Sequence, residues 1–144
     1  MVNSRKIEDL LVPVQNKCKA FLAECAKQKI EVIITSTYRD AESQNALYAI
    51  GRTVKGKKVT TATAGQSYHN WRVAFDVVPL RAGKPVWGTT GADGELWAKL
   101  GAIGKKCGLE WAGDWVKFKE YPHFQYTGGL KLADFQKGKT LNIV

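Results

Sequence analysis

The sequence is poor in several residue types, and each scarcity excludes a class of protein. It has only three cysteines in 144 residues. An odd number of cysteines without a Cys-x-x-Cys pair offers neither a disulfide framework nor a cysteine zinc site. We therefore expect reduced thiols in the core, with Cys18 and Cys25 on one face of a helix. No run of 18 apolar residues occurs, so no membrane-spanning helix is expected.

An apolar leader is also missing from the start of the chain. The first nine residues, MVNSRKIED, contain no apolar stretch. We therefore expect no secretory signal peptide and a protein that stays in the cytoplasm where it is made until something releases it.

Acidic residues are scarce relative to basic ones. There are 13 Asp and Glu against 22 Lys and Arg, which gives a net charge of +9. A basic surface favours anionic partners, for example nucleic acid or a cell envelope. The basic residues are spread along the chain and form no helix-turn-helix or RNP motif, so we expect no nucleic-acid partner. A merely solvated basic surface is the other interpretation.

The hydrophobic pattern of the first half predicts a helix, a strand and a second helix. Apolar residues recur at helical spacing over 5–29, where Pro13 fits best in the first turn and residues before it can form a separate turn. The β-branched segment 31–36 predicts a buried strand. Asp40 is a suitable N-cap for a helix over 41–50, which Gly51 ends. Residues 52–66 are rich in Lys, Thr and Gly and predict a loop.

The second half predicts short strands around one helix. We expect a strand over 74–80, a hairpin to 85–87, a loop over 88–94 and a helix over 95–107. Further strands are expected at 109–111 and 123–126. This order indicates an α+β fold in which about three helices pack on a small antiparallel sheet. The length suits a single domain over 1–144.

The two histidines of the chain, His69 and His123, are candidate metal ligands together with Asp76. Asp76 lies inside an apolar strand, where a carboxylate is costly unless it is paired or bound to a metal. Two imidazoles and a carboxylate form the three-ligand set of a catalytic zinc, which leaves a position for water. Glu120, three residues before His123, is the candidate base for that water.

These segments resemble a known family. Two motifs carry the resemblance: Ser67-x-His69 followed by Ala74-x-Asp76, and Glu120-x-x-His123. They resemble the metal-binding motifs of the zinc peptidases that cut peptidoglycan stem peptides. This family includes D-alanyl-D-alanine carboxypeptidases and L-alanyl-D-glutamate endopeptidases. The resemblance covers most of the chain. Further segments resemble the phage endolysin branch: Ser36-Thr37-Tyr38-Arg39, Gln44 to Ala49, Gly51-Arg52-Thr53, Gly65 to Asn70 and Thr127 to Leu130.

The resemblance implies a function and a set of roles. It implies one Zn²⁺ per chain, at the sheet, held by His69, Asp76 and His123, and Glu120 as catalytic base. It also implies Arg39 as a catalytic and substrate-binding cation and Ser67 as a substrate contact, although Ser67 can equally cap a turn. The implied activity is hydrolysis of the L-alanyl-D-glutamate bond of peptidoglycan, causing bacterial lysis.

The resemblance also implies a setting for that activity. We expect a monomer without a separate cell-wall-binding module, kept in the host cytoplasm until a holin-type protein releases it to the wall. Four aromatic residues are candidates for the walls of the cleft, although aromatic residues are more often simply core: Tyr68, Trp71, Trp111 and Trp115.

Two positions depart from the family pattern. Arg72 stands where the family usually has Gly, so it is either strained at positive φ or places a guanidinium near the cleft. Glu120 stands where the phage endopeptidases usually have Asp, and it reaches one methylene further. These departures leave a D-alanyl-D-alanine carboxypeptidase as the alternative activity. A catalytically inactive wall-binding module is disfavoured because all three candidate ligands and the candidate base are present.

Overall fold

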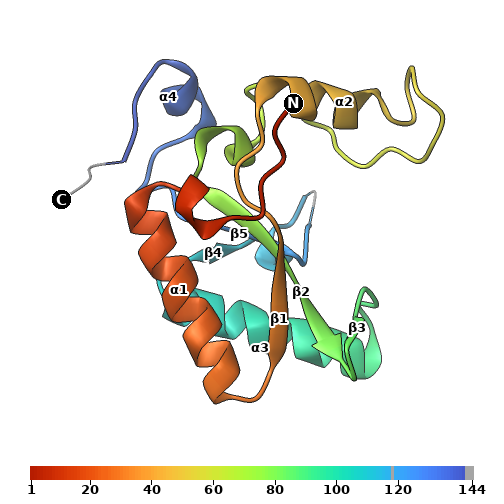
Figure 1. Ribbon diagram of the computed structural model, residues 1–144, viewed down its shortest axis with the longest axis vertical. Coiled ribbons are helices and arrows are strands. Elements are labelled where there is room, and N and C mark those ends of the chain that lie inside the picture. Colours follow the sequence, from red (N-terminus) through yellow and green to blue (C-terminus); the bar gives the residue numbers. More distant parts are fainter. Residues whose placement is uncertain (118, 142–144) are drawn as a thin grey trace.

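The computed structural model describes residues 1–117 and 119–141 (Figure 1). The long helices α1 (Val12–Lys27) and α3 (Gly91–Lys106) pack against each other and against the sheet. The short helices α2 (Ala41–Ala49) and α4 (Leu132–Gln136) lie at the opposite end of the molecule (Figure 1). Three 3-10 turns complete the helical structure: η1 (Ile7–Asp9), η2 (Tyr68–Trp71) and η3 (Ala112–Asp114).

The sheet is antiparallel throughout and has β2 at its centre. Its order is β1 (Glu31–Ser36), β2 (Ala74–Arg81), β5 (His123–Gln125) and β4 (Glu110–Trp111), and β3 (Lys84–Pro85) pairs with the end of β2. The register places Asp76 directly opposite His123. The predicted α+β class with a small antiparallel sheet is therefore confirmed.

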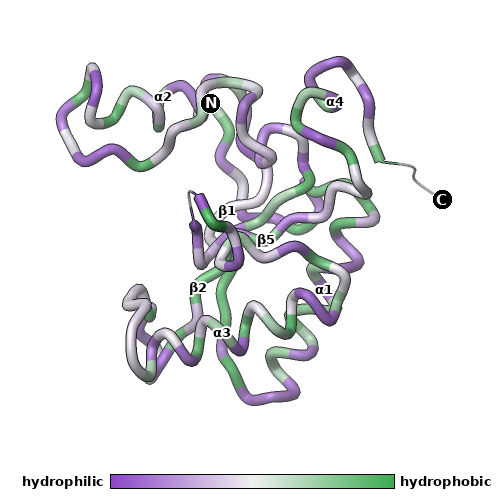
Figure 2. Tube along the Cα trace, turned by 180° about the vertical axis from the view of Figure 1, so that it is seen from behind, coloured by the Kyte–Doolittle hydropathy of each residue, from purple (hydrophilic) through white to green (hydrophobic). Residues whose placement is uncertain are grey.

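The two faces of β2 and β5 have different roles because successive side chains of a strand point to opposite faces. Phe75 and Phe124 point toward the helices and pack with Phe21 of α1, with ring centroids 4.8–6.0 Å apart. The next residue pair along the two strands is Asp76 and His123, and it therefore lies on the other face. Figure 2 shows β2 hydrophobic along most of its length, as expected for the central strand of the core.

The first helix begins later than the pattern over 5–29 predicted. Residues 7–9 form the separate turn η1, and α1 starts with Pro13 in its first turn. The ring of proline blocks a helical hydrogen bond to the preceding turn, so the helix cannot extend toward the N-terminus. The predicted Asp40 cap is confirmed, because its side chain accepts a hydrogen bond from the Ser43 amide at 2.8 Å.

The start of α3 was predicted wrongly. The loop expected over 88–94 ends early, because the helix begins at Gly91 rather than at residue 95. Gly91 and Gly94 have low helix propensity, which hid the first turn. An ion pair of 2.6 Å between Arg81 and Asp93 ties this turn to β2, and the acidic side chain suits a helix N-terminus. The short helix α4 and the 3-10 turns at 68–71 and 112–114 were not predicted either.

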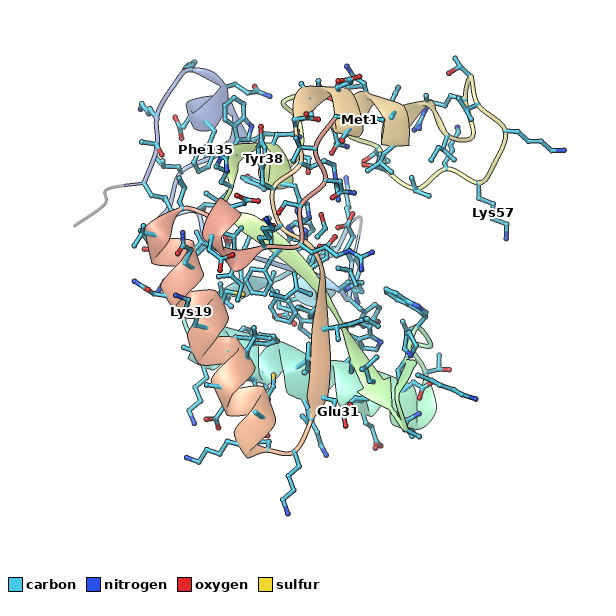
Figure 3. The ribbon with its side chains drawn as sticks, viewed as in Figure 1. Met1, Lys19, Glu31, Tyr38, Lys57 and Phe135 are labelled. Carbon is cyan, nitrogen blue, oxygen red and sulfur yellow. The ribbon has the colours of Figure 1, made fainter. Side chains whose placement is uncertain are left out.

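A long connection follows α2 and projects from the body of the molecule. Figure 3 shows Lys57 at its outer end, pointing away from the sheet. Among the described residues, no helix is long and apolar enough to cross a membrane.

The cysteines give a test of the core. Cys18 and Cys25 are buried in α1, and burial raises the pKa of both thiols to about 12. Because the thiolate is the reactive form, we expect both to resist Ellman's reagent at neutral pH in the folded protein. Only the half-buried Cys107 should react, whereas all three should react in denaturant. A Cys107→Ala variant serves as the control, and fast reaction of two thiols in the native protein would contradict this packing.

Candidate metal centre and catalytic cleft

Three elements bring the candidate ligands together. His69 lies in η2, Asp76 in β2 and His123 in β5. The Oδ1 atom of Asp76 is 3.1 Å from Nε2 of His69 and 3.2 Å from Nδ1 of His123. One ligand atom from each residue lies within 4.8 Å of the others. The segments that carry the two histidines are 54 positions apart in sequence and meet only because β2 pairs with β5 and η2 leads directly into β2.

The orientation of His69 is set by a backbone carbonyl. Its Nδ1 lies 2.8 Å from the carbonyl oxygen of Thr37, which can only accept a hydrogen bond. In the metal-binding form of the ring, the proton therefore sits on Nδ1 and the lone pair is on Nε2, toward Asp76. Ser67 supports this arrangement as the N-cap of η2, since its hydroxyl accepts a hydrogen bond from the His69 amide at 3.3 Å.

The orientation of His123 is set by a chain of two side chains. Glu110 accepts a hydrogen bond from the Gln125 amide nitrogen at 3.3 Å, which directs the amide oxygen of Gln125 toward His123. That oxygen is 2.8 Å from Nε2 of His123, so the ring proton sits on Nε2. The lone pair is then on Nδ1, toward Asp76.

This donor set fits a zinc ion. Ligand atoms at about 2.0–2.2 Å from a tetrahedral zinc are about 3.3–3.6 Å apart, close to the spacing of Asp76 from each histidine. Both lone pairs face the same oxygen. Histidines that bind metals usually donate their second ring N–H to a carbonyl or amide, as His69 and His123 do here.

The charges of the centre support one another. Burial alone would raise the pKa of Asp76. Without a metal, the ring nitrogens of His69 and His123 that face this carboxyl can instead donate to it, and their charges and hydrogen bonds hold its pKa well below the usual range. Burial alone would lower the pKa of His123, but the hydrogen bond and the charge of Asp76 raise it, with Glu120 and Gln125 adding to the effect. Asp76 is therefore an ionised carboxylate, as a metal ligand must be.

The position of Gln125 leads to a prediction. Changing Gln125 to Ala removes the group that orients His123, and we expect a loss of about 10–100-fold in metal affinity. Competition with a chromophoric chelator measures this loss. Gln28→Ala is the matched control, because Gln28 is an exposed residue at the C-cap of α1 whose side-chain amide donates to Glu24, far from the cleft. Equal chelator midpoints for the two variants would show that Gln125 does not orient the ligand.

The three ligands lie in the wall of a cleft of about 740 Å³. Glu120 lies on the same cleft, and its Oε2 is 3.7 Å from Nδ1 of His123. Its side chain is 53% exposed, against 23% for Asp76, so Glu120 faces the open part of the cleft. The amide of Glu120 donates to the Ala112 carbonyl, which holds this segment against η3.

Arg39 is held rigidly at the cleft. Its guanidinium donates to Oε1 of Gln44 at 2.9 Å and to the hydroxyl of Ser36 at 3.2 Å. Its backbone amide donates to the carbonyl of His69 at 3.1 Å. Burial lowers the pKa of the guanidinium, although Asp76 and Glu120 act in the opposite direction. A guanidinium remains protonated regardless, so Arg39 places a fixed positive charge beside the ligands.

Arg72 lies apart from the cleft. It does adopt positive φ, at 63°, which is the strained alternative that its replacement of Gly suggested. Its guanidinium stacks on the ring of Tyr38 at 3.8 Å and donates to the carbonyl of Asp9 at 2.9 Å. These contacts offset the strain and tie η2 to the N-terminal segment. Arg72 is therefore not among the groups that face a substrate.

The aromatic candidates divide into two pairs. Tyr68 and Trp115 line the cleft, whereas Trp71 stacks on Phe135 and Trp111 is buried against Phe124. The groups that orient the histidines were not predicted from the sequence. The spacing of Gln125 two residues after His123 in a strand was an available signal, because it puts both on one face. The Thr37 carbonyl had no such signal, since every residue has one.

Comparisons with known proteins agree with this geometry. A family model described as D-alanyl-D-alanine carboxypeptidase matches residues 60–126, the segment that holds all three candidate ligands and Glu120. The chain is 37% identical over 131 residues to the peptidoglycan L-alanyl-D-glutamate endopeptidase CwlK of Bacillus subtilis, covering 83% of this chain and 78% of that protein. It is 33% identical over 110 residues to the L-alanyl-D-glutamate peptidase of Listeria phage A118, covering 76% and 35%.

A solved structure shares the fold. A mutant of the vancomycin-resistance D,D-pentapeptidase VanY, crystallised in complex with Zn(II), superposes with a TM-score of 0.60 at 17% identity, covering 88% of this chain and 83% of that one. The identity to CwlK over most of both chains is high enough to establish common descent, and the resemblance noted from the motifs is confirmed. The chain belongs to the D-alanyl-D-alanine carboxypeptidase family of metallopeptidases, the M15 peptidases.

Proposed function

We propose that this metallopeptidase is a zinc-dependent endopeptidase that hydrolyses the L-alanyl-D-glutamate bond of peptidoglycan. The observation that carries the proposal is the set of three ligand atoms whose lone pairs converge in a cleft beside Glu120 and Arg39. The identity of 37% to CwlK and of 33% to the phage peptidase, both named for this bond, supports the specificity.

The metal in this proposal is one Zn²⁺ per chain, held by His69, Asp76 and His123. Two imidazoles and one carboxylate are a usual ligand set of catalytic zinc. Zinc in such a site supplies a Lewis acid and lowers the pKa of a bound water. The Zn(II) complex of the structurally similar VanY supports the choice of metal.

The protein groups then have separate roles. Glu120 takes a proton from the attacking water onto a carboxylate oxygen and delivers it to the leaving amine of D-Glu. Its exposed position at the cleft gives it access to both groups. Arg39 stabilises the negative charge that develops on the carbonyl oxygen. Gln44 and Ser36 hold its guanidinium in place before substrate arrives.

Ser67 is proposed to contact substrate as well. It lines the cleft, and its hydroxyl already serves as the cap of η2. The capping role supports the proposed substrate contact, because the turn holds the Ser67 hydroxyl in one position where a bound peptide can meet it.

The bond specificity leads to a prediction with a direct measurement. Digestion of purified sacculi, followed by mass spectrometry of the muropeptides, should yield peptides with a new N-terminal D-Glu and glycan that ends in L-Ala. A chelator should stop the reaction and added Zn²⁺ should restore it. Release of free D-Ala without these products would instead show a D-alanyl-D-alanine carboxypeptidase, the activity for which the family model is named.

A lytic role is part of the proposal. The relative from Listeria phage A118 supports it, and the net charge of +9 favours attachment to an anionic envelope. Loss of turbidity of bacteria with a permeabilised outer layer, after addition of the protein from outside, tests it. Cleavage of sacculi without loss of turbidity would separate peptidoglycan hydrolysis from lysis.

A further inference from the structure

Trp87 is an exposed tryptophan on the catalytic cleft. It lies after β3 and is 57% exposed, whereas the other four tryptophans of the chain are buried or half-buried. Leaving much of an indole in water forfeits part of the stabilisation that burial gives a large apolar side chain. An exposed aromatic residue in a substrate cleft is therefore a candidate for ligand contact.

The backbone on both sides of Trp87 is held firmly. The preceding residue, Val86, is buried, and its amide donates to the Pro79 carbonyl at 2.9 Å. The following residue, Gly88, accepts a hydrogen bond from the indole of the buried Trp97 at 3.0 Å. The exposed ring is therefore presented from a fixed backbone, and a ligand that contacts it does not need to order a loop first.

The rest of the cleft suits a neutral polar ligand. Besides the ligand residues, Glu120 and Arg39, the described lining residues carry only one further charge, that of Lys119. Hydroxyl and amide groups are frequent among the others: Thr60, Thr61, Thr89, Gln66 and Asn3. A pyranose ring has a face of C–H groups that packs on an aromatic ring and a rim of hydroxyl and amide groups that form hydrogen bonds. The cleft offers partners for both.

The proposed bond places a sugar close to this cleft. In peptidoglycan, the L-Ala of the stem is joined through a lactyl group to an N-acetylhexosamine of the glycan. One residue spans at most about 3.6 Å, so the sugar follows the scissile bond after only L-Ala and the lactyl linker. The D-Ala end of the stem is several residues further away. When the first peptide bond lies at the metal centre, the sugar is therefore within reach of the cleft walls.

We propose that Trp87 forms a glycan subsite, in which its indole stacks on the N-acetylhexosamine that carries the stem peptide. This inference rests on the proposed cleavage of the L-alanyl-D-glutamate bond. The subsite distinguishes stem peptides still attached to glycan from free stem peptides, and it makes intact peptidoglycan the preferred substrate.

Two substrates test the subsite. One is a disaccharide-linked stem peptide, and the other is the same peptide without the sugar. For the native protein, kcat/KM should be higher on the linked substrate. Trp87→Ala should reduce the ratio of the two kcat/KM values by about tenfold, as loss of an aromatic stack of about 1.4 kcal/mol would do. Trp87→Phe should retain most of the ratio.

A matched control and the contrary result complete the kinetic test. Val12→Ala, which removes an exposed apolar side chain of α1 outside the cleft, should leave the ratio at the native value. An unchanged ratio in Trp87→Ala would overturn the subsite. An equal loss on both substrates would also overturn it, since the indole would then serve the peptide or the shape of the cleft.

A binding measurement keeps the two proposals separate. N,N′-diacetylchitobiose is titrated into the metal-free protein while the indole N–H resonances are followed by NMR. The Trp87 resonance, assigned as the one missing in Trp87→Phe, should shift most of the five. A titration in which this resonance does not move would overturn the subsite. If the sugar binds but the L-alanyl-D-glutamate bond is not cut, only the proposed function fails.

Discussion

Replacing Glu120 by Ala is expected to leave the fold and the metal content intact and to lower kcat by about 10²–10⁴-fold. The side chain is half-exposed and is not one of the three ligands, so its loss removes little packing. What it removes is the group that moves the proton from water to the leaving amine. Turnover of the disaccharide-linked stem peptide, with zinc content and thermal unfolding measured on the same preparation, gives the result.

Two further variants sharpen this prediction. Glu120→Asp keeps a carboxylate on a side chain one methylene shorter, and it should recover much of the activity because a proton-accepting group is retained. Glu95→Ala is the matched control, since Glu95 is an exposed carboxylate on α3 outside the cleft. Near-native turnover by Glu120→Ala would exclude Glu120 as the base.

Replacing His69 by Ala is expected to abolish both zinc binding and activity. The native protein should contain about one zinc per chain after dialysis, and the variant should contain almost none, because a site with two protein ligands binds weakly. Hydrolysis should fall at least as far as in Glu120→Ala. Elemental analysis of the purified proteins measures the metal, and the same peptide assay measures turnover.

A substitution of the carboxylate ligand Asp76 tests the same metal site independently. Asp76→Asn keeps the shape of the side chain but removes the negative charge between the two histidines, so zinc should again be lost. Asp114→Asn is the control, because Asp114 is half-exposed and pairs with Lys105 at the surface, away from the three ligands. Full zinc occupancy in His69→Ala or in Asp76→Asn would show that the metal is held elsewhere.

Some elements could be predicted from the sequence because their signals are local. The β-branched segment 31–36 forms β1, Asp40 caps α2, and Pro13 lies in the first turn of α1. Each of these depends on the conformational preference of a few adjacent residues. The start of α3 has no such local signal, because two glycines lie in its first turn, and its contact with Arg81 of β2 through Asp93 joins residues twelve positions apart. The expectation that 31–36 would be buried was wrong, because β1 is an edge strand in which only Ser36 is buried.

The aromatic residues show the limit of sequence reasoning at the site. Trp71, Trp111 and Trp115 all lie near motif residues, yet only Trp115 lines the cleft. Trp87, which does line it, lies in a segment without any motif. Whether an indole is buried or exposed depends on what packs against it. Trp71 packs against Phe135 of α4 and Trp111 against Phe124 of β5, and both partners are distant in the sequence.

The sequence by itself determined which chemical groups are available: two imidazoles, one strand carboxylate and a glutamate three residues before the second histidine. It also determined the family, because these groups occur at characteristic spacings. Only the tertiary structure decided which nitrogen of each ring faces the metal position, through the Thr37 carbonyl and the Gln125 amide. It also turned Arg72 away from the cleft. Residue types and spacings are properties of the chain, whereas hydrogen-bond partners and exposure arise only when distant segments pack together.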